Sequence, residues 1–441
     1  MSPLAVAFLI IAIIGVLALP RRWAAFFLLC AGIYLPTSLS FSLGPFNFYA
    51  LRLLLTAAIF RVVIRKEGLA NAMHGLDWVM VIWAAAALSS SLLHDDIGAT
   101  LVNRSGLVFT TCGTYFMFRA FCRSADDVIA ICRIVAIILI PIAIAMGYER
   151  LTGINTFSAF GGVPMPEIRG GSFRARGPFG HSILAGTVGA VSLPLMAPLW
   201  KQYRGTSIAG LLACFAMIFS SSSSGPIMSA AFSLAALLMW PLRYHMRFVR
   251  WMVVFFYIAM DMIMKAPAYY LLARIDLTGS STSWHRAALI ETAIDHWSEW
   301  WLAGTDFTRH WMPYGVPWSG NHIDITNHYL RMGVDGGLPL MLLFIWVLAK
   351  GFSMVGQTLR QSDNAQSQPS FVVWALGAAL FSHAATFMSV SYFDQSVVFF
   401  YLTLATIGLN LIQQEPPPIR QAITLNQYGD GSIVHPFIGE R

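Results

Sequence analysis

Charged residues are scarce in this chain. Asp, Glu, Lys and Arg together make up 11% of its 441 residues, whereas a soluble domain carries about 25%. Hydrophobic residues make up 57%, and the mean hydropathy is +0.64. These values exclude an ordinary soluble protein. They favour a chain divided into membrane spans of about 20 residues with short loops between them.

Cysteine is also sparse, and its placement excludes two further classes. The five cysteines lie in or beside apolar segments, at Cys30, Cys112, Cys122, Cys132 and Cys214. This distribution indicates neither a disulfide framework nor a cysteine metal site. One other group, His322 and Asp324 with His328, has residue types that bind metals, but no second carboxylate or cysteine supports it. We therefore expect no metal and no other cofactor.

Long apolar runs, in contrast, are abundant. They fall at about 4–19, 23–37, 46–64, 77–93, 100–118, 127–146, 180–200, 206–220, 226–242, 248–264, 337–355, 371–389 and 395–412. The strands of a membrane barrel would alternate apolar and polar residues, and these runs do not. The expected fold is an all-α integral membrane protein, a polytopic helical bundle of about 12–13 transmembrane helices. The smaller number applies if the first two runs form one re-entrant element.

Basic residues divide the short connections into two sets. One set carries Arg21, Arg22, Arg61, Arg65, Lys66, Arg119, Arg123, Lys201, Arg204, Arg243, Arg247, Arg250, Lys350 and Arg360. The other set, at about 38–45, 94–99, 220–225 and 390–394, has no Lys or Arg. The positive-inside bias places the first set in the cytoplasm.

This topology puts two long loops, 147–179 and 265–336, on the outer side. Four parts of the chain follow: an N-terminal transmembrane bundle (1–264), a large outer, periplasmic loop carrying short helices (265–336), C-terminal transmembrane helices (337–412) and a cytoplasmic tail (413–441).

Arginines on the outer side suggest a site for an anion. The loop 147–179 contains Arg150, Arg169, Arg174 and Arg176, ahead of His181. The planar guanidinium group binds phosphate oxygens in pairs and stays charged. Arg52 and Arg104 lie near the outer ends of two spans, where a charge must be compensated. Two structural alternatives remain open: loop arginines paired with Glu149 or Glu167, and span arginines that reach to the interface.

The loop 265–336 is rich in tryptophan. It holds Trp284, Trp297, Trp300, Trp301, Trp311 and Trp318, and its stretch 283–297 is predicted to be helical. Tryptophan anchors proteins at membrane interfaces. Its flat ring also stacks on sugar rings. Both interpretations stay open.

The end of the same loop concentrates polar chemistry. Asp324, Asn327, His328 and Arg331 lie within eight residues, just before Gly336 and Gly337. A carboxylate, an imidazole and a guanidinium so close together could form a general base beside an anion site. In the structural alternative, Asp324 and Asn327 cap a helix and His328 packs at the interface.

Taken in order, these motifs resemble a known family. They are Arg174-Ala-Arg176-Gly-Pro-Phe-Gly-His181, the Ser-Ser-Gly-Pro turn ending at Pro226, Trp284-His285-Arg286 followed by Trp301-Leu-Ala-Gly304, and the stretch 324–337. The chain resembles the superfamily of O-antigen ligases and Wzy-type O-antigen (exopolysaccharide) polymerases. Counting back from the Gly pair, Thr326 occupies the position at which the ligase branch has its histidine. Asp-x-x-Asn-x-Tyr-Leu before Gly-Gly is more similar to the polymerase-like proteins.

The resemblance implies a metal-independent, inverting membrane glycosyltransferase in polysaccharide biosynthesis. Its substrate would be an oligosaccharide linked to undecaprenyl pyrophosphate, at the outer leaflet of the bacterial inner membrane. An O-antigen ligase that transfers the glycan to lipid A core is one alternative, and a non-enzymatic transporter or assembly subunit for the same glycan is another. Expected partners are the lipid bilayer and other assembly proteins such as a flippase or a chain-length regulator, with no nucleic acid.

The implied roles fall into three groups. His328 or Asp324 would be the catalytic base. The pyrophosphate would be bound by Arg174, Arg176, Arg331, Arg52, Arg104 and Arg286. The glycan would be bound by Trp284, Trp301, Trp311, Trp318, Asn327 and His181.

Overall fold

The computed structural model describes residues 2–69, 72–265, 267–270, 283–316, 319–364 and 370–409. Its α-helices are α1 (Pro3–Ala18), α2 (Arg21–Tyr34), α3 (Ala50–Ile64), α4 (Gly75–Ser90), α5 (Ile97–Phe121), α6 (Ala125–Thr152), α7 (Ser182–Met196), α8 (Arg204–Ser220), α9 (Ser224–Leu238), α10 (Met246–Ile263), α12 (Ser283–Asp295), α13 (Trp297–Trp300), α14 (His328–Asn364), α15 (Ser370–Thr386) and α16 (Val397–Ile407).

Short elements connect these helices. The 3-10 helices are η1 (Ser91–Leu93), η2 (Thr156–Phe160), η3 (Ala197–Leu199), η4 (Trp240–His245), η5 (Ala268–Tyr270) and η6 (Arg309–Trp311). Two antiparallel hairpins pair β1 (Ser40–Leu43) with β2 (Phe46–Tyr49) and β3 (Glu167–Arg169) with β4 (Ser172–Arg174). Every apolar run predicted from the sequence overlaps one of the α-helices, which confirms the expected helical class.

The described residues contain four helices that are long and apolar enough to cross a membrane, namely α6, α4 with η1, α7 with η3, and most of α14. A fifth candidate is α9 with η4 and α10, a pair bent by 76°. The helices α1, α8, α15 and α16 are apolar but shorter. The chain therefore has the make-up of a multi-pass helical membrane protein, while the number of 12–13 spans stays a prediction.

Two predicted runs differ from the helices at their start. The third run begins as strand β2, and α3 starts only at Ala50, because the segment around Phe46 pairs with β1 across a turn at Gly44. The run expected from about 337 matches the second part of α14, which follows a break with non-helical angles at Gly336 and Gly337. A first part, not expected as helix, begins at His328, where Asn327 caps it: its Oδ1 accepts hydrogen bonds from the N–H groups of Tyr329 and Leu330 at 3.0 and 3.2 Å. The first turns of α14 therefore come from the stretch assigned to the outer loop.

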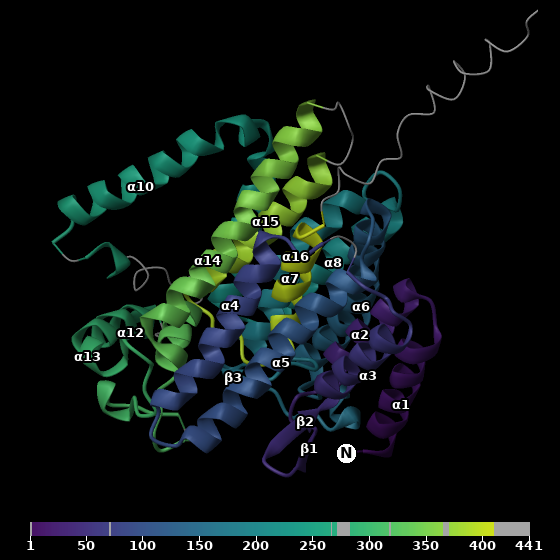
Figure 1. Cartoon of the computed structure of the whole chain (residues 1–441), viewed down its shortest axis with the longest axis horizontal. Coiled ribbons are helices and arrows are strands. Elements are labelled where there is room, and N and C mark those ends of the chain that lie inside the picture. Colours follow the sequence, from purple (N-terminus) through teal and green to yellow (C-terminus); the bar gives the residue numbers. More distant parts are fainter. Residues whose placement is uncertain are drawn as a thin grey trace, which may run out of the picture.

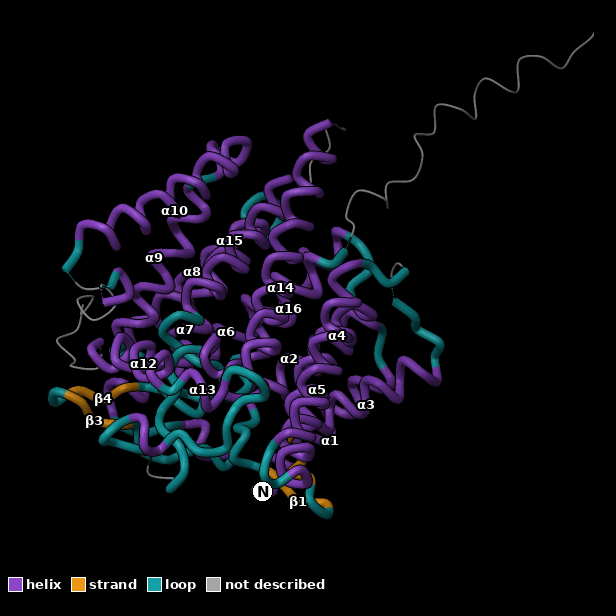
Figure 2. The backbone as a smooth tube through the Cα atoms, turned by 60° about the vertical axis from the view of Figure 1, so that its left-hand side comes forward, coloured by secondary structure: helices purple, strands orange, loops and turns teal. Residues whose placement is uncertain are grey.

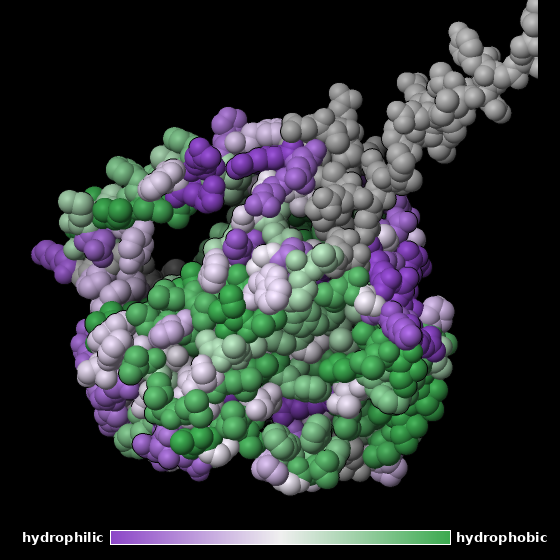
Figure 3. Space-filling view, in the orientation of Figure 1, coloured by the Kyte–Doolittle hydropathy of each residue, from purple (hydrophilic) through white to green (hydrophobic). Residues whose placement is uncertain are grey.

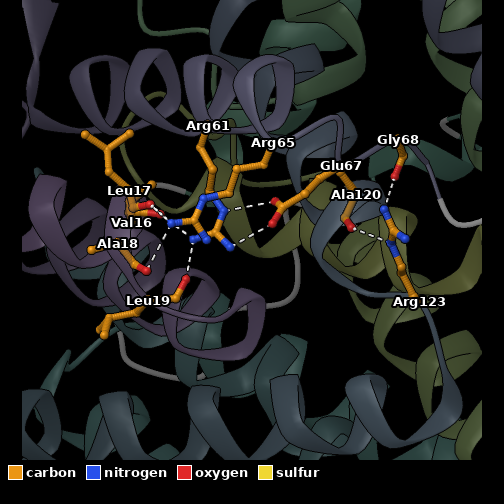
Figure 4. Close-up of polar contacts among 10 residues, drawn as sticks. All are labelled: Val16, Leu17, Ala18, Leu19, Arg61, Arg65, Glu67, Gly68, Ala120 and Arg123. Atoms are coloured by element: carbon orange, nitrogen blue, oxygen red, sulfur yellow. Dashed lines mark hydrogen bonds and ion pairs between the residues drawn. The ribbon is translucent and has the colours of Figure 1, made fainter.

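The helices run up and down between two ends of the bundle (Figure 1). One end, here called the basic end, carries the arginine-rich connections. Arg61 donates to the carbonyl of Val16 and binds both carboxylate oxygens of Glu67 at 2.9 Å, while Arg65 donates to Leu17 (Figure 4). These guanidinium groups satisfy carbonyls that the end of α1 leaves without partners within the helix.

The opposite end, here called the loop end, carries both hairpins, α12 and α13 (Figures 1 and 2). The start of α1 lies there too, because the Ser2 hydroxyl donates to the carbonyl of Ala159 at 2.8 Å. Connections without Lys and Arg lie at this end: His94 bonds to Asp306, and Ser223 accepts a hydrogen bond from Arg174 of the β3–β4 hairpin. The side of a membrane that each end faces stays a prediction. A largely apolar band separates the two ends on the visible face (Figure 3).

Helix α7 is almost entirely buried, and only Ile183 among its residues is half-buried. Small residues allow this: a Cβ on Gly189 would lie 2.8 Å from the carbonyl oxygen of Cys214 in α8. Between α9 and α15, hydroxyls replace apolar contacts. Ser233 donates to Ser382 and Thr386 donates to Ser229, both at 2.7 Å. By contrast, α10 projects from the body and buries none of its residues (Figures 1 and 2).

Candidate functional site

The first turns of α14 hold an ionic triad at the loop end. Arg331 and Asp335 lie one turn apart, and Arg331 Nε donates to Asp335 Oδ2 at 3.0 Å. Asp335 Oδ1 lies 3.0 Å from Arg104 on α5. The side chain of Arg104 is 6% exposed and that of Arg331 is 47% exposed. Two positive charges thus share one carboxylate, and the more accessible guanidinium faces the loop end.

A kink in α14, at Gly336 and Gly337, sets the position of its first turns. Gly337 has a φ of 76°, and a Cβ there would lie 2.3 Å from the carbonyl oxygen of Leu302, next to α13. Gly333 packs against the ring of Trp300, at a distance that leaves no room for a side chain. The Gly-rich stretch at 333–337 therefore lets α14 bend over α13, which fixes the direction in which Arg331 points.

A second cluster forms where the β3–β4 hairpin meets α9. Arg174 donates to Glu167 at 2.9 Å and to the Ser223 hydroxyl at 2.6 Å. Burial lowers the pKa of Arg174, and the charge of Glu167 opposes this shift. His181 Nε2 lies 3.6 Å from the same carboxylate, while its Nδ1 accepts the N–H of Ile183 and caps α7. Burial and the positive charge of Arg174 lower the pKa of His181.

Arg176 lies beside this cluster and makes its hydrogen bonds to Met165 and Glu149. Its side chain donates to the carbonyl of Met165 at 3.3 Å, and its backbone N–H donates to Glu149. The same Glu149 oxygen accepts the N–H of Gly177. Pairing of this loop with Glu149 and Glu167, the structural alternative from the sequence, is therefore present. The two arginines differ, since Arg174 is buried and Arg176 is partly exposed.

Helix α12 also lies next to the cluster formed by Arg174, Glu167 and Ser223. Its Arg286 lies against the first turn of α9, since a Cβ built on Gly225 would be 3.7 Å from the Arg286 guanidinium. The next residue back, His285, bonds through Nε2 to the carbonyl of Asp324 at 3.0 Å. These contacts bring α12, α9 and the segment before α14 together, so the predicted arginines 174 and 286 meet at the start of α9.

Asp324 lies near both clusters. It is exposed, and its negative charge acts on both His181 and Arg331. Asp394 borders the same area, because it accepts the N–H of Gly180 at 2.7 Å. The segments around 174–181, 286, 324 and 331 therefore lie near one another at the loop end.

His328 is placed differently from Asp324. It is buried, and its ring stacks on Phe387 with centroids 4.6 Å apart and meets Phe344 edge-on at 5.2 Å. Its Nδ1 is 3.2 Å from the Ser391 hydroxyl and accepts the backbone N–H of Tyr392 at 3.4 Å. These contacts fix the ring between α14 and the 387–392 turn.

The side chain of Arg52 makes its hydrogen bonds close to the start of its own helix, α3. It donates to the carbonyl of Asn47 at 2.6 Å and to the Thr110 hydroxyl at 3.3 Å, and it lies over the ring of Tyr49. The guanidinium also packs against Gly106 of α5. This arrangement is what an arginine reaching toward an interface would show.

The tryptophans separate by exposure. Trp284 and Trp301 are 50% and 45% exposed, whereas Trp311 is 5% exposed and is stacked against His296. Trp318 lies outside the described residues, as does the tail 413–441. Asn327 is buried and uses its side-chain oxygen as the cap of α14. Among the described tryptophans named for glycan binding, two present an open ring face.

Asp335 was missed by the sequence analysis. A signal was available, because Arg331-x-x-x-Asp335 places opposite charges one helical turn apart. That spacing was not recognised, since the residues were assigned to the end of a loop. Ser223 was assigned to the Ser-Ser-Gly-Pro turn, and its hydrogen bond to Arg174 depends on contact between segments that are distant in the sequence.

No protein-family model, curated protein or solved structure matches this chain.

Proposed function

We propose that the protein is a membrane glycosyltransferase that lengthens a glycan carried on a lipid pyrophosphate. The observation that carries the proposal is Asp324, an exposed carboxylate whose charge acts on both Arg331 and His181, with Arg174 and Arg286 in the neighbouring cluster. A base beside a cluster of guanidinium groups is the arrangement that glycosyl transfer from a pyrophosphate requires.

The arginines would act on the leaving group. A lipid pyrophosphate is already a weak base, so neutralising its developing charge matters more than protonating it. Arg331 is the accessible member of the triad, while Arg104 adds buried positive charge behind it. Arg174 and Arg286 would face the second phosphate, and the N–H groups at the start of α9 favour negative charge there.

Asp324 is the better placed of the two expected bases. In the reaction, an acceptor sugar hydroxyl oxygen forms the new bond to the anomeric carbon and the bond from that carbon to pyrophosphate breaks. The hydroxyl proton passes to Asp324. His328 is 5% exposed, so we assign it a positioning role: it ties α14 to the 387–392 turn through its ring and Nδ1.

The open rings of Trp284 and Trp301 would bind the glycan, because aromatic faces pack against the apolar faces of sugars. We place the reaction on the periplasmic side of a bacterial inner membrane. Two features support this: the basic end has the charge of a cytoplasmic face, and the loop end carries the site residues.

The test is reconstitution. Purified protein in lipid vesicles is incubated with a synthetic undecaprenyl-pyrophosphate oligosaccharide, and products are resolved by mass spectrometry. We expect lipid-linked glycans of increasing length, lost in Asp324→Asn and retained in Arg204→Lys, a substitution at the basic end. Transfer only to added lipid A core would indicate a ligase, and binding without any new glycosidic bond would refute an enzymatic function.

A further inference from the structure

Three potential metal ligands converge on the surface of the large loop, apart from the residues discussed above. They are His296, between α12 and α13; Glu299, in α13; and His310, in η6. One ligand atom from each lies within 4.8 Å of the others. His310 Nε2 is 2.9 Å from Glu299 Oε2.

Hydrogen bonds from neighbouring groups orient His296 and Glu299 for metal binding. His296 Nδ1 donates to the carbonyl of Thr292 at 2.8 Å, which leaves Nε2 with its lone pair. The His296 ring stacks on Trp311 at an interplanar angle of 22°. The indole N–H of Trp311 donates to Glu299 Oε2 at 2.9 Å. Backbone and indole contacts of this kind orient the ligands of known metal sites.

We propose that His296, Glu299 and His310 bind one Zn²⁺ ion, with water as the fourth ligand. Two imidazoles and one carboxylate are a donor set that zinc accepts, whereas Ca²⁺ and Mg²⁺ prefer oxygen ligands alone. Ligands at about 2.1 Å from zinc in a tetrahedron are about 3.4 Å apart. The three atoms lie within 4.8 Å of one another and the His310–Glu299 pair is 2.9 Å apart, so that pair must widen slightly. The side chains of His310 and Glu299 are 40% and 34% exposed, which leaves them free to make that adjustment.

The ion would clamp the large loop. His296 and Glu299 flank the start of α13, and His310 comes from η6 after a reversal of the chain. Helix α13 in turn packs through Trp300 on Gly333 of α14. Zinc would therefore hold η6 against α13 and stabilise the loop that covers the kink of α14. This role is independent of the proposed transfer reaction, and it departs from the absence of metal expected from the sequence.

The proposal is tested with full-length protein in lipid nanodiscs, purified through a tag without histidine and stripped with a chelator. Zn²⁺ is titrated calorimetrically, and bound metal is counted by mass spectrometry after desalting. We expect one Zn²⁺ per chain and at least a 100-fold loss of affinity in each of three variants. These are His296→Phe, which keeps a ring on Trp311, Glu299→Gln, which keeps an acceptor for the indole, and His310→Phe, which keeps a ring beside Phe307.

His245→Ala, at an exposed histidine of η4 near the basic end, is the matched control and is expected to bind zinc normally. Melting temperatures in zinc-free buffer show whether each variant is folded, and zinc is expected to raise only those of the wild type and the control. Failure of the wild type to bind zinc, or unchanged binding in the three folded variants, would overturn the proposal. Glycan transfer is measured separately, so its loss or survival leaves this result unaffected.

Discussion

Asp335 and Arg104 form a buried ion pair, with 3.0 Å between Oδ1 and a guanidinium nitrogen, and they join α14 to α5. The other oxygen of Asp335 binds Arg331. Through this carboxylate, the accessible Arg331 is held in place by a helix that is distant in the sequence. The pair therefore links the stability of the bundle to the geometry of the candidate site.

Asp335→Asn is expected to destabilise the protein, because Arg104 would remain buried without a compensating charge. Removing one partner of a buried pair costs about 3–5 kcal/mol. The melting temperature in detergent or nanodiscs measures the effect. In the double variant Arg104→Gln with Asp335→Asn, both charges of the pair are gone, and part of the loss is expected to return. Equal stability of wild type and Asp335→Asn would show that this pair does not hold the helices together.

Gly337→Ala is expected to destabilise the kink of α14. Its φ of 76° disfavours any side chain, and the new Cβ would lie 2.3 Å from the carbonyl oxygen of Leu302. The unfavourable backbone alone costs about 1–3 kcal/mol. Gly356 is the control, since it lies in the same helix with open space around it.

Gly356→Ala is expected to leave the melting temperature unchanged or to raise it, because alanine favours a helix by up to about 1 kcal/mol over glycine. If both substitutions lowered stability equally, the kink would not be the cause.

His181 gives the protein a predictable dependence on pH. Burial and Arg174 lower its pKa, so the folded state keeps the ring neutral where the unfolded chain, with a pKa of about 6.5, takes up a proton. Arg176 acts in the same direction, whereas Glu167 and Asp324 act against it. Below that pH the unfolded state binds more protons, so stability is expected to fall as the pH drops. Protonation would also end the acceptance of the Ile183 N–H by Nδ1.

His181→Asn keeps a side chain that caps helices and removes the titrating ring. Melting temperatures measured between pH 7.5 and 5 are expected to decline less in this variant than in the wild type. Parallel curves for the two proteins would assign the decline to other groups.

Arg174→Lys tests the anion site. Lysine keeps the charge but loses the fork that reaches Glu167 and Ser223 together. By analogy with removing one donor from an oxyanion hole, transfer is expected to slow by on the order of 10²–10³-fold. The rate of glycan extension in vesicles is the measurement, with Arg204→Lys at the basic end as control. An unchanged rate in Arg174→Lys would remove this residue from the site.

Sequence reasoning located the helices well because each apolar run is a local property. The division of the connections into a basic set and a set without Lys or Arg could also be read from the sequence. In the structure, His74 Nε2 bonds to the carbonyl of Gly408, so the segment before α4 meets the end of α16. Element boundaries were less accurate. The start of α14 depends on the Asn327 cap, and β2 depends on pairing with β1, which compete with simple hydropathy.

Within the candidate site, the sequence identified the arginines but not their partners. Arg174 and Arg331 stood out as charges in an apolar chain. Their partners come from distant parts of the chain. Arg331 shares Asp335 with Arg104, which lies 231 positions earlier than Asp335 (335 − 104), and Arg174 binds Ser223 of another segment. The same applies to His328, whose aromatic neighbours come from α14 and from the 387–392 turn that follows α15.

The sequence by itself determined that this is a helical, membrane-type protein with its scarce charge divided between two ends, because hydropathy and charge act residue by residue. Only the tertiary structure decided which charges are neutralised, which of Asp324 and His328 is exposed, and which histidines could share a metal ion. Those outcomes depend on burial and on distances of a few ångströms, which arise when separate helices pack against one another.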